Sequence, residues 1–183
     1  MQKEVRLTAI QTCPDKKMPM VSQTSAVLIA DMGIEHDRYA TGLGAFSKST
    51  RANVPPELNQ GRPVIRDVSF ISKQAILAAN AARRTLFPNL LDESAFTFAD
   101  TRRNFELNYE GDIRELIGVF FQIGSVVFLG IEPCDPCDRP STISGKPGFK
   151  ESFDGRGGLR ARVVEGGILS INTVMEVVPF AVS

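Results

Sequence analysis

Two cysteines three positions apart mark the segment with the clearest chemical potential. Residues 132–139 read Glu-Pro-Cys-Asp-Pro-Cys-Asp-Arg, which places Cys134 and Cys137 beside prolines and close to Arg139. Prolines restrict the backbone. A neighbouring cation favours the thiolate, the form of cysteine that attacks electrophiles and binds soft metals, although the aspartates beside the cysteines oppose this effect. The segment therefore suits a working thiol, or a pair of inert loop cysteines.

A second segment, residues 100–105, carries groups that suit an anion or a heterocycle. It holds Arg102, Arg103 and Asn104 just before a strand-like stretch. Guanidinium forks fit phosphate or carboxylate, and an amide can both donate and accept toward the edge of a ring. The alternative is a solvated charged turn.

A third segment, residues 156–162, reads Arg-Gly-Gly-Leu-Arg-Ala-Arg. Its glycines let the backbone approach a ligand closely. Arg160 and Arg162 would share one face of a strand, since side chains alternate along it. The alternative here is a hairpin with a polar outer face.

The cysteines admit two further interpretations. With His36, the single histidine, the three cysteines Cys13, Cys134 and Cys137 could form a Cys3His zinc site, but a second paired ligand motif is missing. A thioredoxin-like redox pair is the other. Such a pair usually opens a helix within a βαβ unit, whereas the residues after Cys137 predict a loop. The odd number of cysteines argues against a disulfide framework.

Strands dominate the elements that must position these groups. Alternating or β-branched stretches bounded by turn residues predict strands over 5–10, 25–30, 64–71, 159–164 and 168–178, with one or two buried strands in 119–131. Residues 33–63 read as loop, since prolines, glycines and asparagines interrupt both ladders and helices.

Helices are expected to be few. Ser72 is a good N-cap for an alanine-rich helix that ends near Phe87, and Asp112 can cap a short helix through Ile117. Many short strands without a regular strand–helix alternation favour a mainly β, α+β fold, a closed or partly closed barrel with a few short helices, over a doubly wound sheet.

Length and composition limit the function classes. The 183 residues, 43% of them hydrophobic, predict one domain over 1–183. With 21 basic and 21 acidic residues, no overall field recruits nucleic acid or a membrane surface, so any anion binding must be local. The apolar run 119–131 falls short of a bilayer span, and the N-terminus lacks the pattern of a secretory signal. A cytoplasmic location is expected.

Taken together, these segments resemble the MOSC family, named for the C-terminal domain of molybdenum cofactor sulfurase. The resemblance extends from about Val5 to Val178 and keeps the order of the family's motifs. Its matching stretches are Gly33–Gly42 for the Gly-Ile-x-Gly-Asp-Arg-Tyr-Ala opening, Arg66–Ile71 for the following strand, Arg103-Asn104, the cysteine segment Glu132–Arg139, and Arg156–Val163 for the Arg-Gly-Gly-Leu-Arg-Ala-Arg-Val run.

The chain departs from the family pattern at two places. His36 stands where the family usually has glycine, next to Asp37, a position often assigned to the site. Residues 169–172 read Leu-Ser-Ile-Asn where the family usually ends Val-Gly-Asp, which alters the closing hairpin.

The resemblance implies a predominantly β domain built round a barrel, and sulfur or molybdenum chemistry at one cysteine. In members with paired cysteines the second one faces the metal, which is Cys137 here, with Cys134 beside it. The implied cofactor is the molybdenum cofactor, molybdopterin, which need not stay bound to the isolated protein. Arginines 102, 103, 160 and 162 would hold its phosphate, Asn104 its pterin edge, and Asp37 would border the site.

Two functions remain open at this point. The chain could belong to a molybdenum-dependent reductase of N-oxygenated compounds that takes its electrons from separate partner proteins, because no flavin or iron–sulfur motif is present. Alternatively, Cys137 could accept a persulfide from a pyridoxal-phosphate cysteine desulfurase and pass the sulfur on to metal–sulfur centres. Cys134 could then resolve the persulfide as a disulfide. Either function requires Cys137, Arg102, Asn104 and one of Arg160 and Arg162 to meet at one cleft.

Overall fold

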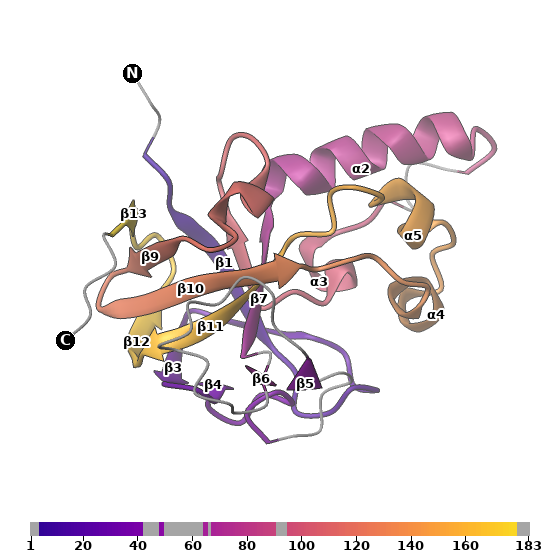
Figure 1. The fold of residues 1–183 in the computed structure, drawn as a ribbon. Coiled ribbons are helices and arrows are strands. Elements are labelled where there is room, and N and C mark those ends of the chain that lie inside the picture. The colour runs from indigo at the N-terminus through magenta and orange to yellow at the C-terminus, as the bar shows by residue number, and fades with distance from the viewer. Residues whose placement is uncertain (1–3, 42–47, 50–63, 66, 91–94, 179–183) are drawn as a thin grey trace.

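One eight-stranded sheet organises the fold (Figure 1). The structure is a computed structural model that describes residues 4–41, 48–49, 64–65, 67–90 and 95–178. The strand order is β13-β9-β10-β11-β7-β8-β1-β2. The strands span Leu7–Thr12 (β1), Val21–Gln23 (β2), Val68–Ser72 (β7), Phe105–Leu107 (β8), Phe120–Ile123 (β9), Val126–Pro133 (β10), Leu159–Glu165 (β11) and Met175–Val177 (β13).

All neighbours in this sheet are antiparallel except β7 and β8, which run parallel with Phe70 opposite Phe105. A parallel pair needs a long crossover. The chain supplies it with helix α2 (Lys73–Leu86) and helix α3 (Phe98–Thr101). The crossover therefore delivers Arg102, Arg103 and Asn104 directly to the start of β8, in the middle of the sheet.

The sheet curls back on itself without forming a closed barrel. A single antiparallel bridge joins Arg6, just before β1, to Val174, just before β13. It is supported by a hydrogen bond from the Leu7 amide to the Thr173 carbonyl at 2.9 Å. The α+β, mainly β class expected from the sequence is confirmed, and of the barrel only this partial closure is present.

Phenylalanine rings fill the interior of the curled sheet. Phe70 lies 4.9 Å from Phe105, 5.4 Å from Phe121 and 5.1 Å from Phe128, measured between ring centroids. These four side chains are fully buried. The contacts of Phe70 with Phe121 and Phe128 are edge to face, a geometry that is favourable beyond the apolar area buried, so the sheet has one continuous aromatic core.

Helix α2 packs outside that core, on a second apolar cluster. Its inward side chains Ile76 and Ala79 meet Phe149 and Phe153, which belong to and follow helix α5 (Phe149–Ser152). Ser72 caps α2 by accepting a hydrogen bond from the Ala75 amide at 3.0 Å, as the sequence predicts. Within the described part of the chain, no helix has the length and apolarity needed to cross a membrane.

Smaller elements complete the fold. A three-stranded sheet has the order β12-β3-β4, and a two-stranded sheet pairs β5 with β6. Their bounds are Ser25–Ile29 (β3), Gly33–Ile34 (β4), Lys48–Ser49 (β5), Val64–Ile65 (β6) and Gly167–Ser170 (β12). The 3-10 helix η2 (Ile113–Leu116) is capped by Asp112, and helix α4 covers Arg139–Ser144.

The closing strand expected over residues 168–178 is two strands, β12 and β13, because a turn with Asn172 in the left-handed region separates them.

Two further local predictions need correction. The residues after Cys137 were expected to form a loop, yet α4 begins at Arg139, because Pro140 is favourable in a first helical turn and Gly145 ends the helix in the left-handed region. The loop expected over residues 33–63 contains the short strands β4 and β5, whereas its parts over 42–47 and 50–63 lie outside the described residues, as does Arg66 of the family motifs.

Candidate functional site

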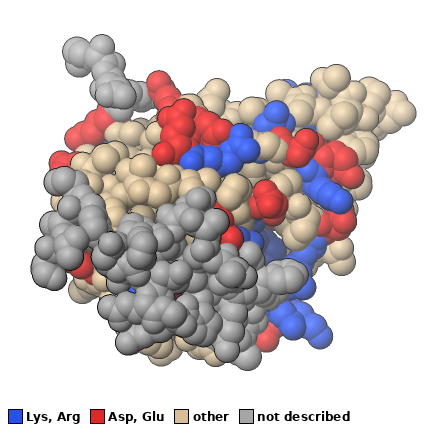
Figure 2. Space-filling view, in the orientation of Figure 1, with Lys and Arg blue, Asp and Glu red and all other residues tan. Residues whose placement is uncertain are grey.

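A small pocket lies where several of the predicted site residues meet. It has a volume of about 80 Å³ and is lined by Lys16, Arg38, Tyr39, Arg102, Cys137, Arg139, Pro140 and Arg160. Five of these side chains are basic, and among the described residues none that lines the pocket carries a carboxylate. On the described part of the face in Figure 2, acidic and basic side chains lie close together, whereas the pocket lining carries one sign of charge.

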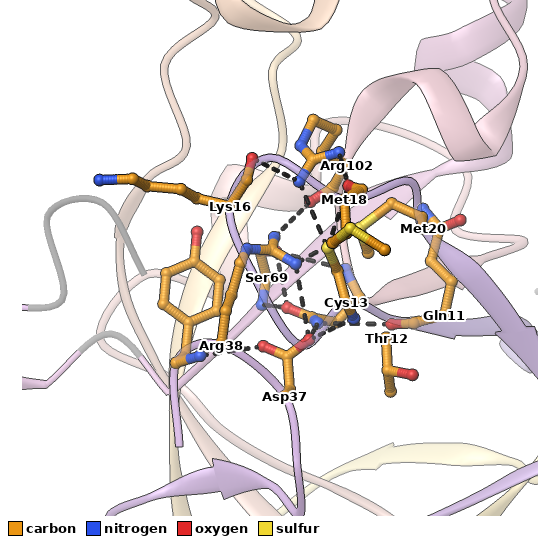
Figure 3. Close-up of polar contacts among 12 residues, drawn as sticks. Gln11, Thr12, Cys13, Lys16, Met18, Met20, Asp37, Arg38, Ser69 and Arg102 are labelled. Carbon is orange, nitrogen blue, oxygen red and sulfur yellow. Dashed lines mark hydrogen bonds and ion pairs between the residues drawn. The ribbon is translucent and has the colours of Figure 1, made fainter. Parts of the chain in front are cut away.

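Arg102 is brought into the pocket by an unusual backbone conformation. It ends α3 with φ 58°, in the left-handed region where glycine is the usual residue. Its guanidinium donates to the carbonyls of Met18 at 2.9 Å and Lys16 at 3.1 Å, and to the Cys13 sulfur at 3.5 Å (Figure 3). The side chain is therefore held by the turn after β1 rather than by a carboxylate.

Arg38 lies against Arg102. Its guanidinium donates to the Arg102 carbonyl at 3.1 Å and lies 3.5 Å from the Asp37 carboxylate (Figure 3). It also covers the Tyr39 ring, 4.7 Å from the centroid, a cation–π contact. Burial lowers the pKa of Arg102, and the nearby charge of Arg38 lowers that pKa further. Two like charges thus face one small volume.

Arg160 reaches the pocket from the start of β11. It stands opposite Ser69 of β7 and Glu132 of β10, and its guanidinium is 3.5 Å from the Glu132 carboxylate. Burial lowers the pKa of Arg160, but Cys134, Tyr39 and Glu132 together raise that pKa above its ordinary value. Arg160 consequently stays charged in the pocket wall.

Cys137 supplies the thiol. It is exposed, whereas Cys13 and Cys134 are buried. It precedes α4, whose first residues Arg139 and Pro140 also line the pocket. The chain continues through α5 to β11, which is antiparallel to β10, so the cysteine pair does not lie in a βαβ unit of the thioredoxin kind.

Asp37 and Asn104 form a buried polar centre next to the pocket. Asp37 accepts hydrogen bonds from the Cys13 amide at 2.8 Å, the Tyr39 amide at 3.1 Å and the Asn104 side chain at 3.4 Å. The Asn104 side-chain oxygen accepts from the Ser69 hydroxyl at 3.0 Å. Both side chains are fully buried, so they orient the Asp37–Tyr39 turn and the start of β8.

Arg103 joins two of the chemically active segments. It donates to the carbonyls of Thr101 at 2.9 Å, Gly157 at 2.8 Å and Cys134 at 3.0 Å. A Cβ at position 157 would lie 2.2 Å from the Cys134 carbonyl oxygen, so glycine is required there. Gly157, which was expected to let the backbone approach a ligand, instead lets residues 156–158 pack against the cysteine segment.

The remaining predicted residues lie outside the pocket lining. Arg162 shares a face of β11 with Arg160, as expected, but forms an ion pair with Asp31. Cys134 is buried, and its amide donates to the Gly158 carbonyl at 2.8 Å. The structure therefore brings Cys137, Arg102 and Arg160 together from three segments, and places Asn104, Asp37 and Arg103 behind them.

His36 neither lines nor blocks the pocket. Its side chain is exposed, and its backbone has φ 64°. That value explains why the related pattern has glycine at this position. No group of three or more His, Cys, Asp or Glu side chains within the described residues could hold a metal ion, so the Cys3His set does not assemble there.

Five lining residues were missed as site candidates: Lys16, Arg38, Tyr39, Arg139 and Pro140. Arg38 and Tyr39 belong to the Asp-Arg-Tyr-Ala stretch, whose family resemblance was the available signal, and Arg139 was noted only as a cation beside Cys137. Lys16 carries no such signal, since it comes to the pocket through the turn after β1.

The sequence matches no protein family and no curated protein. The fold, however, is similar to solved structures. The chain is 16% identical in sequence to YuaD from Bacillus subtilis, and its structure matches the YuaD crystal structure with a TM-score of 0.65. The match covers 96% of each chain. For the crystal structure of YiiM from Escherichia coli, the identity is 15% and the TM-score is 0.59, over 97% of this chain and 72% of YiiM. The chain thus shares its fold with YuaD and YiiM, which supports the MOSC-like fold that its motifs imply.

Proposed function

We propose that this chain is a MOSC-type domain whose basic pocket binds the anionic end of the molybdenum cofactor beside Cys137. The observation that carries the proposal is the composition of the pocket, in which five basic side chains and one exposed thiol face a common volume. Guanidinium groups suit oxyanions, and a thiolate is a soft metal ligand.

The residues of the pocket fit the anionic or metal end of the molybdenum cofactor, but not the whole cofactor. A pocket of about 80 Å³ accommodates a metal-oxo or phosphate end but not a pterin ring system. Cys137 would hold the metal, and Arg102 and Arg160 its oxygens or the phosphate, while Arg38 adds positive charge. The cofactor, when bound, would supply the redox chemistry for reducing N-oxygenated compounds, with electrons from separate partner proteins.

The side chains behind the pocket have positioning roles in this proposal. Arg103 holds the cysteine segment in place, and Asp37 with Asn104 holds the turn that carries Arg38. Cys134 and Arg162 contribute through the segments that carry them rather than by direct contact. A cofactor contact is therefore assigned to Cys137, Arg102 and Arg160, three of the residues expected from the sequence.

The test is expression in a host that makes the molybdenum cofactor, followed by elemental analysis and visible absorbance. The wild-type protein is expected to retain molybdenum, and Cys137→Ser to lose it. Cys134→Ser is the matched thiol control and should keep the metal, because that thiol is buried. Equal molybdenum in the Cys137→Ser and wild-type proteins would contradict the assignment.

A second candidate function is a persulfide carrier on Cys137. The exposure of this thiol at the pocket favours it, since a partner protein such as a pyridoxal-phosphate cysteine desulfurase needs direct access to the accepting sulfur. Incubation with a desulfurase and cysteine should add the mass of one sulfur atom to the wild-type protein and none to Cys137→Ser. Intact-mass spectrometry without reductant reads this out.

A further inference from the structure

The pocket has more positive charge than its own acidic neighbours balance. Arg38 has Asp37 and Arg160 has Glu132 as carboxylate partners, each at 3.5 Å. Arg102 is bound by carbonyls and a thiol, which leave its charge uncompensated. Within the described part of the chain, Lys16 and Arg139 also line the pocket without a carboxylate partner, and both are exposed. The pocket therefore favours a ligand with more than one negative charge.

The size of the pocket limits that ligand. About 80 Å³ corresponds to about two or three water molecules, or to one tetrahedral oxyanion. Organic ligands of ordinary size need about 300 Å³ or more. A small inorganic dianion matches both the charge and the volume.

The pocket also contains a nucleophile. Cys137 is the exposed thiol of the chain, and it lines the pocket together with Arg139 and Arg160. A dianion held there would have its outer atom next to a sulfur that can attack it. A thiolate and a dianion repel each other, and only an excess of positive charge makes their encounter productive.

We propose that the pocket binds thiosulfate or a similar sulfane-sulfur oxyanion, and that Cys137 takes the outer sulfur from it. This inference rests on the persulfide-carrier function and names its donor. The Cys137 thiolate attacks the outer sulfur, a Cys–S–S bond forms, and the bond between the two sulfurs of thiosulfate breaks. Sulfite leaves with the electron pair of that bond, and Cys137 becomes a persulfide anion. The total charge is unchanged, and no oxidant or reductant is consumed.

The arrangement of charges suits each stage of this transfer. The basic side chains would offset three negative charges, one on the thiolate and two on the donor, while the new bond forms. Sulfite keeps two of these charges and stays attracted to Arg102 and Arg160 as it forms. The persulfide remains on an exposed residue, where an acceptor protein can reach it.

The experiment uses the reduced full-length protein with thiosulfate. The expected result is release of one sulfite per protein and addition of one sulfur atom to Cys137, with neither in Cys137→Ser. The double variant Lys16→Gln/Arg139→Gln removes two exposed charges and should lower the rate about tenfold or more. Lys17→Gln is the matched control, since Lys17 is exposed next to Lys16 but does not line the pocket; its rate should equal that of the wild type.

A pair of alkylating reagents separates anion recognition from general loss of thiol reactivity. Iodoacetate and iodoacetamide differ mainly in charge. The rate with iodoacetate divided by the rate with iodoacetamide at Cys137 should fall in Lys16→Gln/Arg139→Gln. The same ratio should stay constant in Lys17→Gln. An unchanged ratio and an unchanged thiosulfate rate in the double variant would overturn the proposal.

The outcomes also distinguish this proposal from the function on which it depends. If a desulfurase or polysulfide loads Cys137 and thiosulfate does not, the donor assignment is wrong and the carrier function stands. If none of these donors loads Cys137, both fail.

Discussion

The three thiols of the chain have different surroundings, and this decides their reactivity. Cys137 is exposed on the basic pocket. Cys13 is buried and donates to the carbonyl of Met18 at 3.1 Å. Cys134 is also buried, and its carbonyl accepts a hydrogen bond from Arg103. Access rather than sequence spacing therefore separates the cysteine pair into one working thiol and one structural thiol.

Native-state alkylation should label Cys137 alone. Cys13 and Cys134 are expected to react only after unfolding in denaturant, because access governs thiol modification as strongly as thiolate content does. Mass spectrometry of the labelled peptides gives the measurement, with Cys137→Ser as the control that takes up no label in the native state. Equal, slow labelling of all three cysteines would contradict the special role of Cys137.

The backbone of His36 is strained, and among the described residues its exposed side chain has no hydrogen bond that would offset the strain. A residue with a Cβ at φ 64° is strained by about 1 kcal/mol relative to glycine. Part of the gain on replacement is lost to the greater freedom of glycine in the unfolded chain. His36→Gly should therefore raise the free energy of unfolding by about 0.5 kcal/mol.

Urea denaturation measures this change. Glu35→Gly is the matched control, since Glu35 is the exposed neighbour and lacks a positive φ. That substitution should lower stability instead. A loss of stability in His36→Gly would show that the imidazole makes a favourable contact.

At the level of elements, the pocket is built where loops meet the central strands. Arg102 comes from the end of α3, Arg38 from the turn after β4, Cys137 from the segment between β10 and α4, and Arg160 from β11. Only Arg160 lies within a strand. The precision of the site therefore depends on side chains that tie the loops together, above all Arg103.

Arg103→Lys should destabilise the protein although it keeps the charge. The guanidinium satisfies three carbonyls, those of Thr101, Gly157 and Cys134, whereas an ammonium on a flexible stem does not reproduce that fork. The expected loss is about 1.5–3 kcal/mol, the range for hydrogen bonds to a charged group.

Denaturant unfolding measures the loss, and hydrogen exchange in residues 134–138 should accelerate because the cysteine segment loses its anchor. Arg114→Lys is the control, since Arg114 forms an exposed ion pair with Asp112 at 2.6 Å that contributes little. Equal stability of the two variants would contradict the anchoring role.

At the scale of the whole molecule, the aromatic core beneath the curled sheet connects strands that are far apart in the sequence. Phe70 on β7 contacts Phe105 on β8, Phe121 on β9 and Phe128 on β10. β7 also pairs with β11 and precedes α2, so the core and the second apolar cluster share one strand.

Phe70→Leu should lower the free energy of unfolding by about 1–3 kcal/mol, because three ring contacts are lost together. If residues 1–183 form one domain, fluorescence, circular dichroism and Cys13 accessibility should report one shared transition. Leu77→Ala is the control, since Leu77 is 57% exposed and should change stability by less than about 0.5 kcal/mol. Two separate transitions would contradict the single-domain prediction.

Local signals in the sequence predict the longer strands and the helix α2, but not the short elements β2, β5, α3, α4 and α5. The alternation before Cys13 predicts β1, and the serine at position 72 predicts the start of α2. Of the glycines at 166 and 167, which predict the break after β11, Gly166 forms the break and Gly167 begins β12. Such signals act within a few residues, through side-chain direction, capping and backbone freedom, so they can be read without the fold. The helix after Cys137 was not predicted, because Asp138, Pro140 and Gly145 at and near its ends are also typical of a turn.

Which polar residues face the pocket follows from the three-dimensional packing of the chain. Arg102 and Arg103 are adjacent, yet one reaches the pocket and the other the interior, because the left-handed backbone at Arg102 turns their side chains apart. Arg160 and Arg162 share a strand face, but an ion pair with Asp31 holds Arg162 elsewhere. Lys16 joins them through the turn after β1, where its carbonyl accepts a hydrogen bond from Arg102. These outcomes depend on strand pairing between distant segments, which residue types alone do not specify.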